Sequence, residues 1–479
     1  MKYIALIVVM GITLIGNFRN ATAAPVEKPN FVIVFTDDQG YQDVGCFGSP
    51  KIKTPELDRM AREGCRFTSF YVAAHVCSPS RGALLTGRHP GRIPINGVYF
   101  PRNDKGMPLS EITLADVLKK QGYATSCVGK WHLGHTQEYL PAKRGFDTYF
   151  GIPYSNDMAQ DGRAPLARNA KFYAGMKLEN YREYQPKNGT DDKVLYKKYK
   201  SKVPLISGTD VIEWPVDQTQ LTRRYTEEAV QFIKSHQDQP FFLYLAHSMP
   251  HIPLFASDGF KGKSARGLYG DVIEEIDWSV GRVLQTLRDL KLGKKTFVIF
   301  TSDNGPWLVM GENGGAAEPL RDGKGSTYEG GQRVPCIMWW PGQIQAGTEN
   351  NEMASTMDMM PTLSWLAGTE PPADRVIDGH NIWPLMIGKA GAKTPYKAFV
   401  YYRGEAVRVG DWKYRKGKEY GTWLKKQKDK ENPVVEQLFN LKDDIGEQEN
   451  LIDQYPEKAA QLKAKLDAFR RQVQPKKKN

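Results

Sequence analysis

Cysteine is scarce in this chain, with five cysteines among 479 residues. Such sparse usage excludes a small disulfide-bonded scaffold, because that class relies on many bridges instead of a hydrophobic core. If Cys77 serves another purpose, the remaining four are enough for at most two bridges. The sequence leaves the pairing and the oxidation state of these four residues open: Cys46, Cys65, Cys127 and Cys336.

Long hydrophobic runs are also missing. The apolar run near the N-terminus, Tyr3–Ile15, is shorter than the roughly 20 residues that a membrane-spanning helix needs. It follows Lys2 and precedes Ala21-Thr22-Ala23, a small-residue step typical of signal peptidase sites. We therefore expect residues 1–23 to be a signal peptide, no stable membrane span, and a periplasmic or secreted mature protein. An uncleaved N-terminal anchor is the alternative.

The chain has no excess of acidic residues and carries a formal net charge of +12. Solvated surface side chains account for most of this positive charge. A more specific interpretation is that the charge attracts a polyanionic substrate. No nucleic-acid-binding motif is present, so we expect no nucleic acid partner. The composition, with 40% hydrophobic and 25% charged residues, is that of a globular protein. The length predicts two domains.

Three apolar, β-rich runs end abruptly in polar residues. They are Phe31–Phe35, Phe241–Ala246 and Thr296–Phe300, and each is typical of a strand buried on both faces of a parallel sheet. Helical patterns lie between them, at Thr113–Gln121, Thr222–His236 and Tyr269–Leu290. Strands that alternate with helices indicate an α/β domain, in which sites form outside the carboxyl ends of the strands.

The composition and pattern of the sequence change at two points. Between Asn156 and Val216 it becomes charged and rich in tyrosine, which we interpret as a long insertion near the site. After Gly388, short strands and a terminal helix predict a smaller α+β domain with an antiparallel sheet. We therefore expect a catalytic domain over 24–390 and a C-terminal subdomain over 391–479. The expected elements of the latter are Ala398–Arg403, Ala406–Val409, Trp412–Arg415, Leu438–Leu441 and the helix Pro456–Val473.

Oxygen ligands follow two of the buried strands. Asp37 and Asp38 come after the first strand, and Asp303 and Asn304 come after the third. Oxygen-only ligation suits Ca²⁺ or Mg²⁺. Aspartate and asparagine also start turns after strands, but two matched strand ends together favour a metal site.

The most informative motif is Cys77-Ser78-Pro79-Ser80-Arg81, followed by Gly82–Arg88. Taken alone, Cys77 could be a small buried residue, or a reactive thiol whose pKa Arg81 lowers. The motif resembles the signature of type I sulfatases, in which the cysteine is oxidised to Cα-formylglycine. That resemblance implies a maturation enzyme as a partner and a modified residue, instead of a thiol, at position 77.

Other segments extend the resemblance from about Pro29 to Leu451. Gly129–Gly134 matches a Gly-Lys-Trp-His-Leu-Gly segment, and Asp322–Gly331 matches a loop with a sulfate-binding lysine, Lys324. Gly151–Asp157 is similar to the branch of arylsulfatase A and N-acetylgalactosamine-6-sulfatase, whose serine corresponds to Ser155. His251 precedes an x-Pro step as the family's histidine does, so we prefer it to His247.

The resemblance implies an alkaline-phosphatase-like α/β fold with a mixed, mostly parallel central sheet. It also implies a mechanism in which a formylglycine diol oxygen at position 77 attacks the sulfur of a sulfate ester. His251 and Lys324 assist departure of the alcohol, and His132 deprotonates the second hydroxyl when sulfate is expelled. In this mechanism Arg81, Lys130 and Lys324 supply fixed positive charge. A divalent cation, Ca²⁺ or Mg²⁺, adds to it and is bound by Asp37, Asp38, Asp303, Asn304 and residue 77.

The implied activity is release of sulfate from a sulfated carbohydrate or an aryl sulfate. Two rivals stay open at this point: a phosphonate or phosphate monoester hydrolase with the same modified residue, and an inactive protein that binds sulfated glycans. The sequence does not identify the sugar, the sulfated position, endo or exo action, or the oligomeric state.

Overall fold

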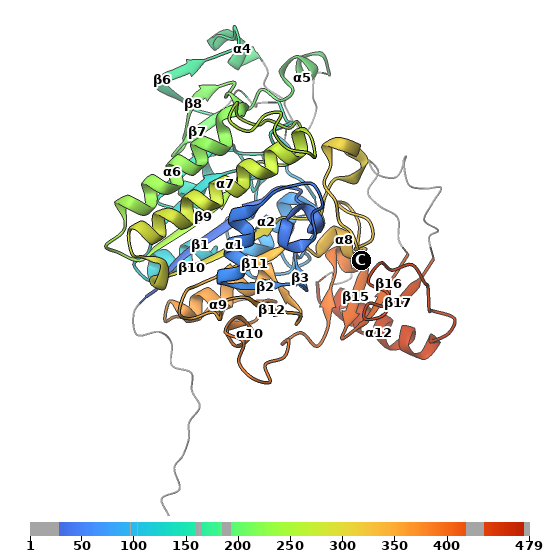
Figure 1. Cartoon of the computed structure of the whole chain (residues 1–479). Helices are drawn as coiled ribbons and strands as arrows, with labels where there is room; N and C mark the ends of the chain where they lie inside the picture. The colour runs from blue at the N-terminus through green and yellow to red at the C-terminus, as the bar shows by residue number, and fades with distance from the viewer. Residues whose placement is uncertain are drawn as a thin grey trace, which may run out of the picture.

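The computed structural model describes residues 28–473 except 96, 103, 160, 161, 163, 184–192 and 418–434. The expected signal peptide lies outside the described residues. The centre of the protein is an eleven-stranded sheet (Figure 1). In spatial order its strands are β12 (Thr348–Asn350), β2 (Cys65–Phe67), β11 (Cys336–Trp339), β10 (Thr296–Ser302), β1 (Asn30–Thr36), β9 (Phe241–Ala246), β4 (Ala124–Gly129), β5 (Thr148–Gly151), β7 (Leu205–Ser207), β8 (Asp210–Trp214) and β6 (Leu166–Phe172).

The five strands β10, β1, β9, β4 and β5 are neighbours and all run parallel. Antiparallel pairs occur on either side of this block, where β11 joins β10 and β7 joins β5. The expectation of a mixed, mostly parallel sheet is therefore confirmed. Because the five strands share one direction, their carboxyl ends lie along one edge of the sheet, which is where polar site residues can meet.

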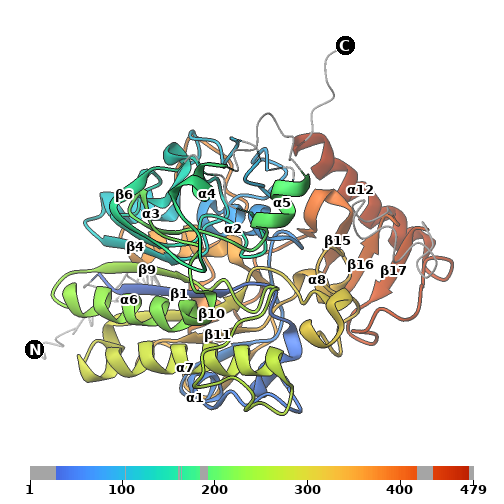
Figure 2. The same cartoon turned by 90° about the horizontal axis from the view of Figure 1, so that it is seen from above.

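Helices cover both faces of the sheet, as the view in Figure 2 shows. One layer contains α1 (Pro55–Glu63), α6 (Leu221–Ser235) and α7 (Leu268–Asp289), and the other contains α2 (Cys77–Thr86) and α3 (Leu114–Lys120). The helix α9 (Met359–Leu366) packs against α2 and α3 and belongs to the same layer. The predicted helices at Thr113–Gln121, Thr222–His236 and Tyr269–Leu290 are confirmed to within two residues at each end.

The sequence of β1 explains the two layers. Phe31, Ile33 and Phe35 belong to the hydrophobic core that α2, α3 and α9 share. Val32 and Val34 point the other way, into the core that α1, α6 and α7 share. A strand whose successive side chains are all apolar is stable only when both faces are covered, because its side chains alternate between them.

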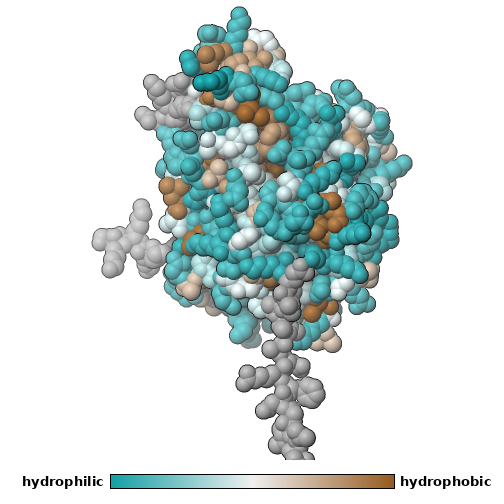
Figure 3. Space-filling view, turned by 90° about the vertical axis from the view of Figure 1, so that its left-hand side faces the viewer, coloured by the Kyte–Doolittle hydropathy of each residue, from teal (hydrophilic) through white to brown (hydrophobic). Residues whose placement is uncertain are grey.

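The segment 156–216 extends the sheet instead of lying outside it. It supplies β6, β7 and β8, and the short helices α4 (Leu178–Glu183) and α5 (Lys193–Tyr199) lie with them at the top of Figure 1. Trp214 is buried there and packs against Tyr181 and Tyr199, with ring centroids 5.4 Å and 5.7 Å apart. The tyrosines of this segment therefore pack around Trp214 and extend the hydrophobic core that α2, α3 and α9 share. On the face shown in Figure 3 most side chains are hydrophilic and the apolar ones form small separate patches.

The C-terminal part forms the predicted antiparallel sheet and helix. Its strands are β14 (Phe399–Val400), β15 (Ala406–Val409), β16 (Trp412–Arg415) and β17 (Gln437–Asn440), and α12 (Pro456–Val473) packs on them. The expected strand Ala398–Arg403 is shorter than predicted, because Tyr402–Gly404 forms a 3₁₀ turn, η9. The five cysteines are all unpaired thiols in the structure. Among the described residues no helix combines the length and apolar character needed to cross a membrane.

Candidate active site

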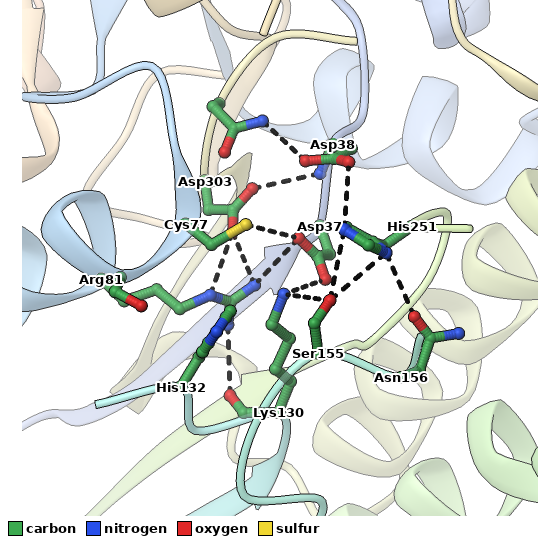
Figure 4. A network of polar contacts seen from close by, with 12 residues as sticks. Asp37, Asp38, Cys77, Arg81, Lys130, His132, Ser155, Asn156, His251 and Asp303 are labelled. Carbon is green, nitrogen blue, oxygen red and sulfur yellow. Dashed lines mark hydrogen bonds and ion pairs between the residues drawn. The ribbon is translucent and has the colours of Figure 1, made fainter. Parts of the chain in front are cut away.

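The sequence-predicted site residues converge at the carboxyl edge of the parallel strands (Figure 4). Asp37 and Asp38 follow β1, Asp303 and Asn304 follow β10, and Lys130 follows β4. Cys77 is the first residue of α2, so it lies at the positive end of a helix dipole. The topology thus brings together groups that are far apart in the chain, such as Asp38 and Lys324, which are separated by 286 residues.

Three carboxylates and one thiol form a compact buried cluster. One ligand atom from each of Asp37, Asp38, Asp303 and Cys77 lies within 4.8 Å of the others. The side-chain amide of Asn304 donates to Asp38 Oδ1 at 2.8 Å, while the buried Oδ1 of Asn304 has no hydrogen-bond partner. Crowded carboxylates and an unpartnered amide oxygen are the donor set that a hard divalent cation prefers. The residues therefore fit the expected Ca²⁺ or Mg²⁺.

Three cationic side chains surround this cluster and are themselves buried. Lys130 Nζ lies 2.5 Å from Asp37 Oδ2, and Lys324 Nζ lies 2.7 Å from Asp38 Oδ2. The guanidinium of Arg81 bonds Asp303 Oδ2 through Nε at 3.0 Å and the carbonyl of Lys130 at 3.1 Å. Each cation is thus fixed by a carboxylate or a carbonyl, so it needs no reorganisation when an anion approaches.

The charges act unequally on the carboxylates. Burial alone would raise the pKa of Asp37, but Lys130, His251 and Arg81 outweigh it and hold that pKa well below its usual range. Burial, with the charge of Asp37 beside it, raises the pKa of Asp303 to about 7. A cation bound among these oxygens would relieve their mutual repulsion, which is a second reason why the site suits one.

Cys77 is poorly placed to act as a thiolate. Burial raises the pKa of its thiol well above the ordinary value, in spite of the charges of Lys130 and Lys324. Arg81, which we considered as the group that would activate the thiol, is bonded to Asp303 and Lys130 instead. The reading of Cys77 as a reactive thiol with a lowered pKa is therefore wrong. Its sulfur lies 3.5 Å from Asp37 Oδ1 and 3.6 Å from Lys324 Nζ.

His132 is held with one ring nitrogen ready to accept a proton. Its Nε2 lies 3.0 Å from the carbonyl of Tyr99, which can only accept, so Nε2 carries the hydrogen. Nδ1 is then an acceptor, and it is buried with no hydrogen-bond partner. Burial holds the pKa of His132 well below its usual value, which keeps the imidazole neutral. Its φ of +59° is a rare conformation for a residue other than glycine.

His251 lies beside the carboxylate cluster and contacts Ser155. Both of its ring nitrogens are within 3.3 Å of Ser155 Oγ, and Nε2 is 3.7 Å from Asp38 Oδ2. Ser155 Oγ also accepts from Lys130 Nζ at 3.3 Å. His247 instead packs on α7, where its Nε2 meets Ser279 Oγ at 3.2 Å. The placement of the two histidines thus agrees with our preference for His251.

A cavity of about 340 Å³ opens over this cluster. Cys77, His132, Ser155, His251 and Lys324 line its polar end. The remaining wall is mostly apolar or aromatic and is formed by His75, Val76, Gly97, Val98, Phe100, Asp157, Met158, Trp307, Gly325, Tyr402 and Arg403. Asp37, Asp38, Asp303 and Asn304 lie behind the polar end and do not line the cavity. This volume suits a small molecule or one end of a larger one.

Sequence reasoning missed several residues that shape the site. Asn156 Oδ1 accepts from the ring nitrogen Nδ1 of His251 at 3.2 Å. Trp307 lies against Lys324, 4.6 Å from its ammonium, and its ring centroid is 5.5 Å from that of His251. Asn156 is adjacent to Ser155, and Trp307 follows Asp303-Asn304-Gly305-Pro306, so proximity in sequence was the available signal.

The fold and the site together are those expected of a hydrolase for an anionic ester, with buried cations beside a carboxylate cluster that could hold a metal ion. The chain matches the sulfatase family over residues 29–369, and its C-terminal part matches the description "N-sulphoglucosamine sulphohydrolase, C-terminal" over 322–472. It belongs to the sulfatase family and is a sulfuric ester hydrolase.

Curated relatives support this assignment over most of the chain. N-acetylgalactosamine-6-sulfatase of Canis lupus familiaris is 42% identical over 410 residues, covering 82% of this chain and 72% of the relative. Arylsulfatase A of Homo sapiens is 40% identical over 406 residues, covering 82% and 76%. The expected resemblance to the branch that contains these two enzymes is confirmed.

Solved structures give the same fold. The PsFucS1 sulfatase from Pseudoalteromonas sp. superposes with a TM-score of 0.78 at 27% identity, over 94% of this chain and 91% of that one. Ps i-CgsB superposes with a TM-score of 0.75 at 30% identity, over 93% of both chains. The phosphonate monoester hydrolase of Agrobacterium radiobacter reaches 0.60 at 16% identity, which shows the shared fold alone. The alternative of a phosphonate or phosphate monoester hydrolase is therefore not favoured.

Proposed function

We propose that this sulfatase hydrolyses sulfate esters of carbohydrates with a formylglycine at position 77 and a divalent cation, Ca²⁺ or Mg²⁺, beside it. The observation that carries the proposal is the buried cluster of Asp37, Asp38, Asp303 and Cys77. It combines carboxylates that could hold a cation with a thiol that burial keeps protonated. A thiol of that kind is a poor nucleophile, whereas its oxidation product would carry an oxygen nucleophile at the same point.

The cation would be held by Asp37, Asp38, Asp303 and Asn304, and it would supply positive charge that polarises the sulfate group. The protein's own cations support the same task. Lys324 Nζ lies 3.6 Å from the sulfur of Cys77, the charge of Lys130 also acts on that thiol, and the amino end of α2 adds its dipole there. Charge that develops on the sulfuryl oxygens therefore meets groups already in place, which is where electrostatic catalysis is most effective.

Proton transfer falls to the two histidines that line the cavity. His132 offers an unpartnered Nδ1, so it is suited to take a proton from the second hydroxyl of the hydrated residue 77. His251 and Lys324 are suited to stabilise and protonate the leaving alcohol, since both line the cavity and Trp307 packs against both. Ser155 links Lys130 to His251 and would hold both side chains in place beside a bound sulfate group.

The N-terminal segment and the domain division complete the proposal. We infer a cleaved signal peptide over 1–23, a periplasmic or secreted mature protein and a maturation enzyme that oxidises Cys77. We also propose a catalytic domain over 24–390 and a C-terminal subdomain over 391–479. Their interface is supported by Lys413, which is buried between Glu329 and Glu447 at 2.9 Å and 2.8 Å.

Sulfate release by two variants tests the proposal. We expect Cys77→Ala and Lys324→Ala each to lower kcat on an aryl sulfate by at least about a hundredfold, because each removes a group that acts in the transition state. Cys46→Ala is the matched control, since Cys46 is a partly exposed thiol remote from the cavity. Near-normal sulfate release by either variant would overturn the assignment, provided that the control retains its activity.

The substrate class is supported by two observations. The cavity combines a polar, cationic end with aromatic walls from Trp307, Tyr402 and Phe100, and aromatic faces pack well on the apolar face of a sugar ring. The most similar curated relatives include an enzyme named for a sulfated amino sugar. Aryl sulfates fit the same walls, so we expect them to serve as test substrates.

A further inference from the structure

The outer wall of the cavity carries a cation that the proposed reaction does not use. Arg403 lines the cavity together with Tyr402, and both belong to η9, the turn between β14 and β15 of the C-terminal sheet. The catalytic cations Arg81, Lys130 and Lys324 are buried and paired with carboxylates. Arg403 is an exposed residue in the lining of the same cavity.

The backbone of this turn holds Arg403 in a conformation that other residues rarely adopt. Arg403 has φ +59°, and the next residue, Gly404, has φ +64°. Glycine adopts a positive φ without cost, but arginine does not, so the surrounding contacts must enforce it. Strained residues of this kind cluster at functional sites, where the conformation aims a side chain.

Contacts on both sides of Arg403 enforce the turn. The N–H of Tyr402 donates to Gln332 Oε1 at 3.1 Å, and the amide of Gln332 donates to the carbonyl of Val72 at 2.8 Å. The N–H of Gly404 donates to the carbonyl of Tyr401 at 3.0 Å. The C-terminal sheet is therefore bonded through this turn to the segment that leads to Cys77.

Aromatic packing fixes the turn against the same segment. The ring of Tyr402 meets the ring of His75 edge to face, with centroids 5.0 Å apart, two residues before Cys77. The guanidinium of Arg403 lies over the ring of Tyr402, 5.3 Å from its centroid. A guanidinium stacked on a buried ring keeps its N–H groups directed sideways, where they can bind a carboxylate or a sulfate in a bidentate manner.

Resting on the proposed function, we propose that Arg403 binds a second anionic group of the substrate, a sugar carboxylate or a second sulfate, outside the catalytic cluster. Val98, Phe100 and Met158, which also line the cavity, carry no charge, and the guanidinium of Arg102 lies over the ring of Phe100, 4.6 Å from its centroid. The enzyme then prefers sulfated sugars that carry a further negative charge over those that carry the scissile sulfate alone. Arg403 acts on specificity and not on the chemical step.

Steady-state kinetics on matched substrates tests this role, with the full chain converted at position 77. The probes are a monosulfated disaccharide with a hexuronate, its carboxyl-reduced counterpart, a disulfated disaccharide without a carboxylate, and para-nitrophenyl sulfate. We expect Arg403→Gln to lower kcat/KM on an anion-bearing disaccharide by about tenfold more than on the reduced disaccharide and the aryl sulfate, because a charge-assisted hydrogen bond is lost. Most of the loss should lie in KM, since binding is affected more than the transition state.

The pattern of losses identifies the group and separates the two proposals. A selective loss on the hexuronate substrate assigns a carboxylate to Arg403, and a selective loss on the disulfated substrate assigns a second sulfate. Arg403→Lys should recover part of the preference, and Arg223→Gln, which removes an exposed charge from α6, should leave it unchanged. Equal losses on all four substrates, or no loss on any, would overturn the role of Arg403. If the wild-type enzyme released sulfate from none of them, the proposed function itself would fail.

Discussion

Replacing Lys413 by methionine should destabilise the protein strongly, although Lys413 lies outside the cavity. Lys413 is fully buried, and its ammonium lies 2.9 Å from Glu329 Oε1 and 2.8 Å from Glu447 Oε1. The ring of Tyr401 covers it, 4.3 Å from the ammonium. Lys413→Met would leave two carboxylates buried side by side without the charge that separates them.

The magnitude follows from the burial of the pair. Breaking a buried ion pair by removing one partner costs about 3–5 kcal/mol, because the remaining charge stays desolvated. For a protein of this size, with an unfolding entropy of about 1 kcal/mol/K, that cost corresponds to a fall in Tm of about 3–5 °C. Glu447 is the group that suffers most: burial and the neighbouring Glu329 already raise its pKa to about 6 in the presence of Lys413, which lowers it.

Thermal unfolding measured at pH 7.5 would test this reasoning. Lys393→Met is the matched control, because Lys393 pairs with Glu352 at 3.0 Å but is 80% exposed. Surface pairs contribute about 0–1 kcal/mol, so this variant should hardly change Tm. The double variant Lys413→Met/Glu447→Gln should recover at least about 1 kcal/mol of the loss, since it removes one of the two stranded charges. Equal Tm values for Lys413→Met and the control would refute the argument.

Three further predictions concern pH, metal and backbone packing. Burial lowers the pKa of His89 to about 4. In the unfolded chain this histidine is therefore protonated near pH 6.5, whereas in the folded protein it stays neutral until the pH reaches about 4. The contribution of His89 to the free energy of unfolding should therefore fall by up to about 3 kcal/mol as the pH falls from 6.5 to 4. Urea titrations over this pH range should show a shallower fall for His89→Gln than for the wild type. Parallel plots of unfolding free energy against pH for the two proteins would contradict this. Removal of the bound divalent cation with a chelator should lower Tm. Adding Ca²⁺ or Mg²⁺ back at about 100 times its Kd should restore about 2.7 kcal/mol of unfolding free energy. An unchanged Tm, together with no metal detected by elemental analysis, would count against the metal site. Gly129→Ala should lower both Tm and sulfate release, because a Cβ there would lie 1.9 Å from the carbonyl oxygen of Ala246, beside Lys130; normal activity and stability would argue against this packing.

Local sequence patterns determine much of the fold, so this part could be predicted from the sequence. The apolar run Phe31–Phe35 can be stable only with both faces covered, and the structure covers both. The strands Ala406–Val409 and Trp412–Arg415 and the helix Pro456–Val473 have the predicted bounds. Periodicity and turn residues determine such elements before any tertiary contact forms.

The remainder depends on contacts between distant segments. Trp214, Tyr181 and Tyr199 are separated in the chain, so their shared core gave no periodic signal and β6–β8 were not predicted. The same holds for the cavity. Nothing in the sequence around Arg403 indicates that the turn in the C-terminal sheet lines the cavity beside Cys77, since that proximity is created by Gln332 and His75.

The central claim is the nature of residue 77, and mass spectrometry tests it most directly. Trypsin cleaves after Arg66 and Arg81, so it releases Phe67–Arg81 as one peptide with Cys77 inside. Protein made together with a formylglycine-generating enzyme should yield this peptide with the mass of the aldehyde or its hydrate, and the same preparation should release sulfate from an aryl sulfate. An unmodified thiol at position 77 in fully active protein would contradict the account.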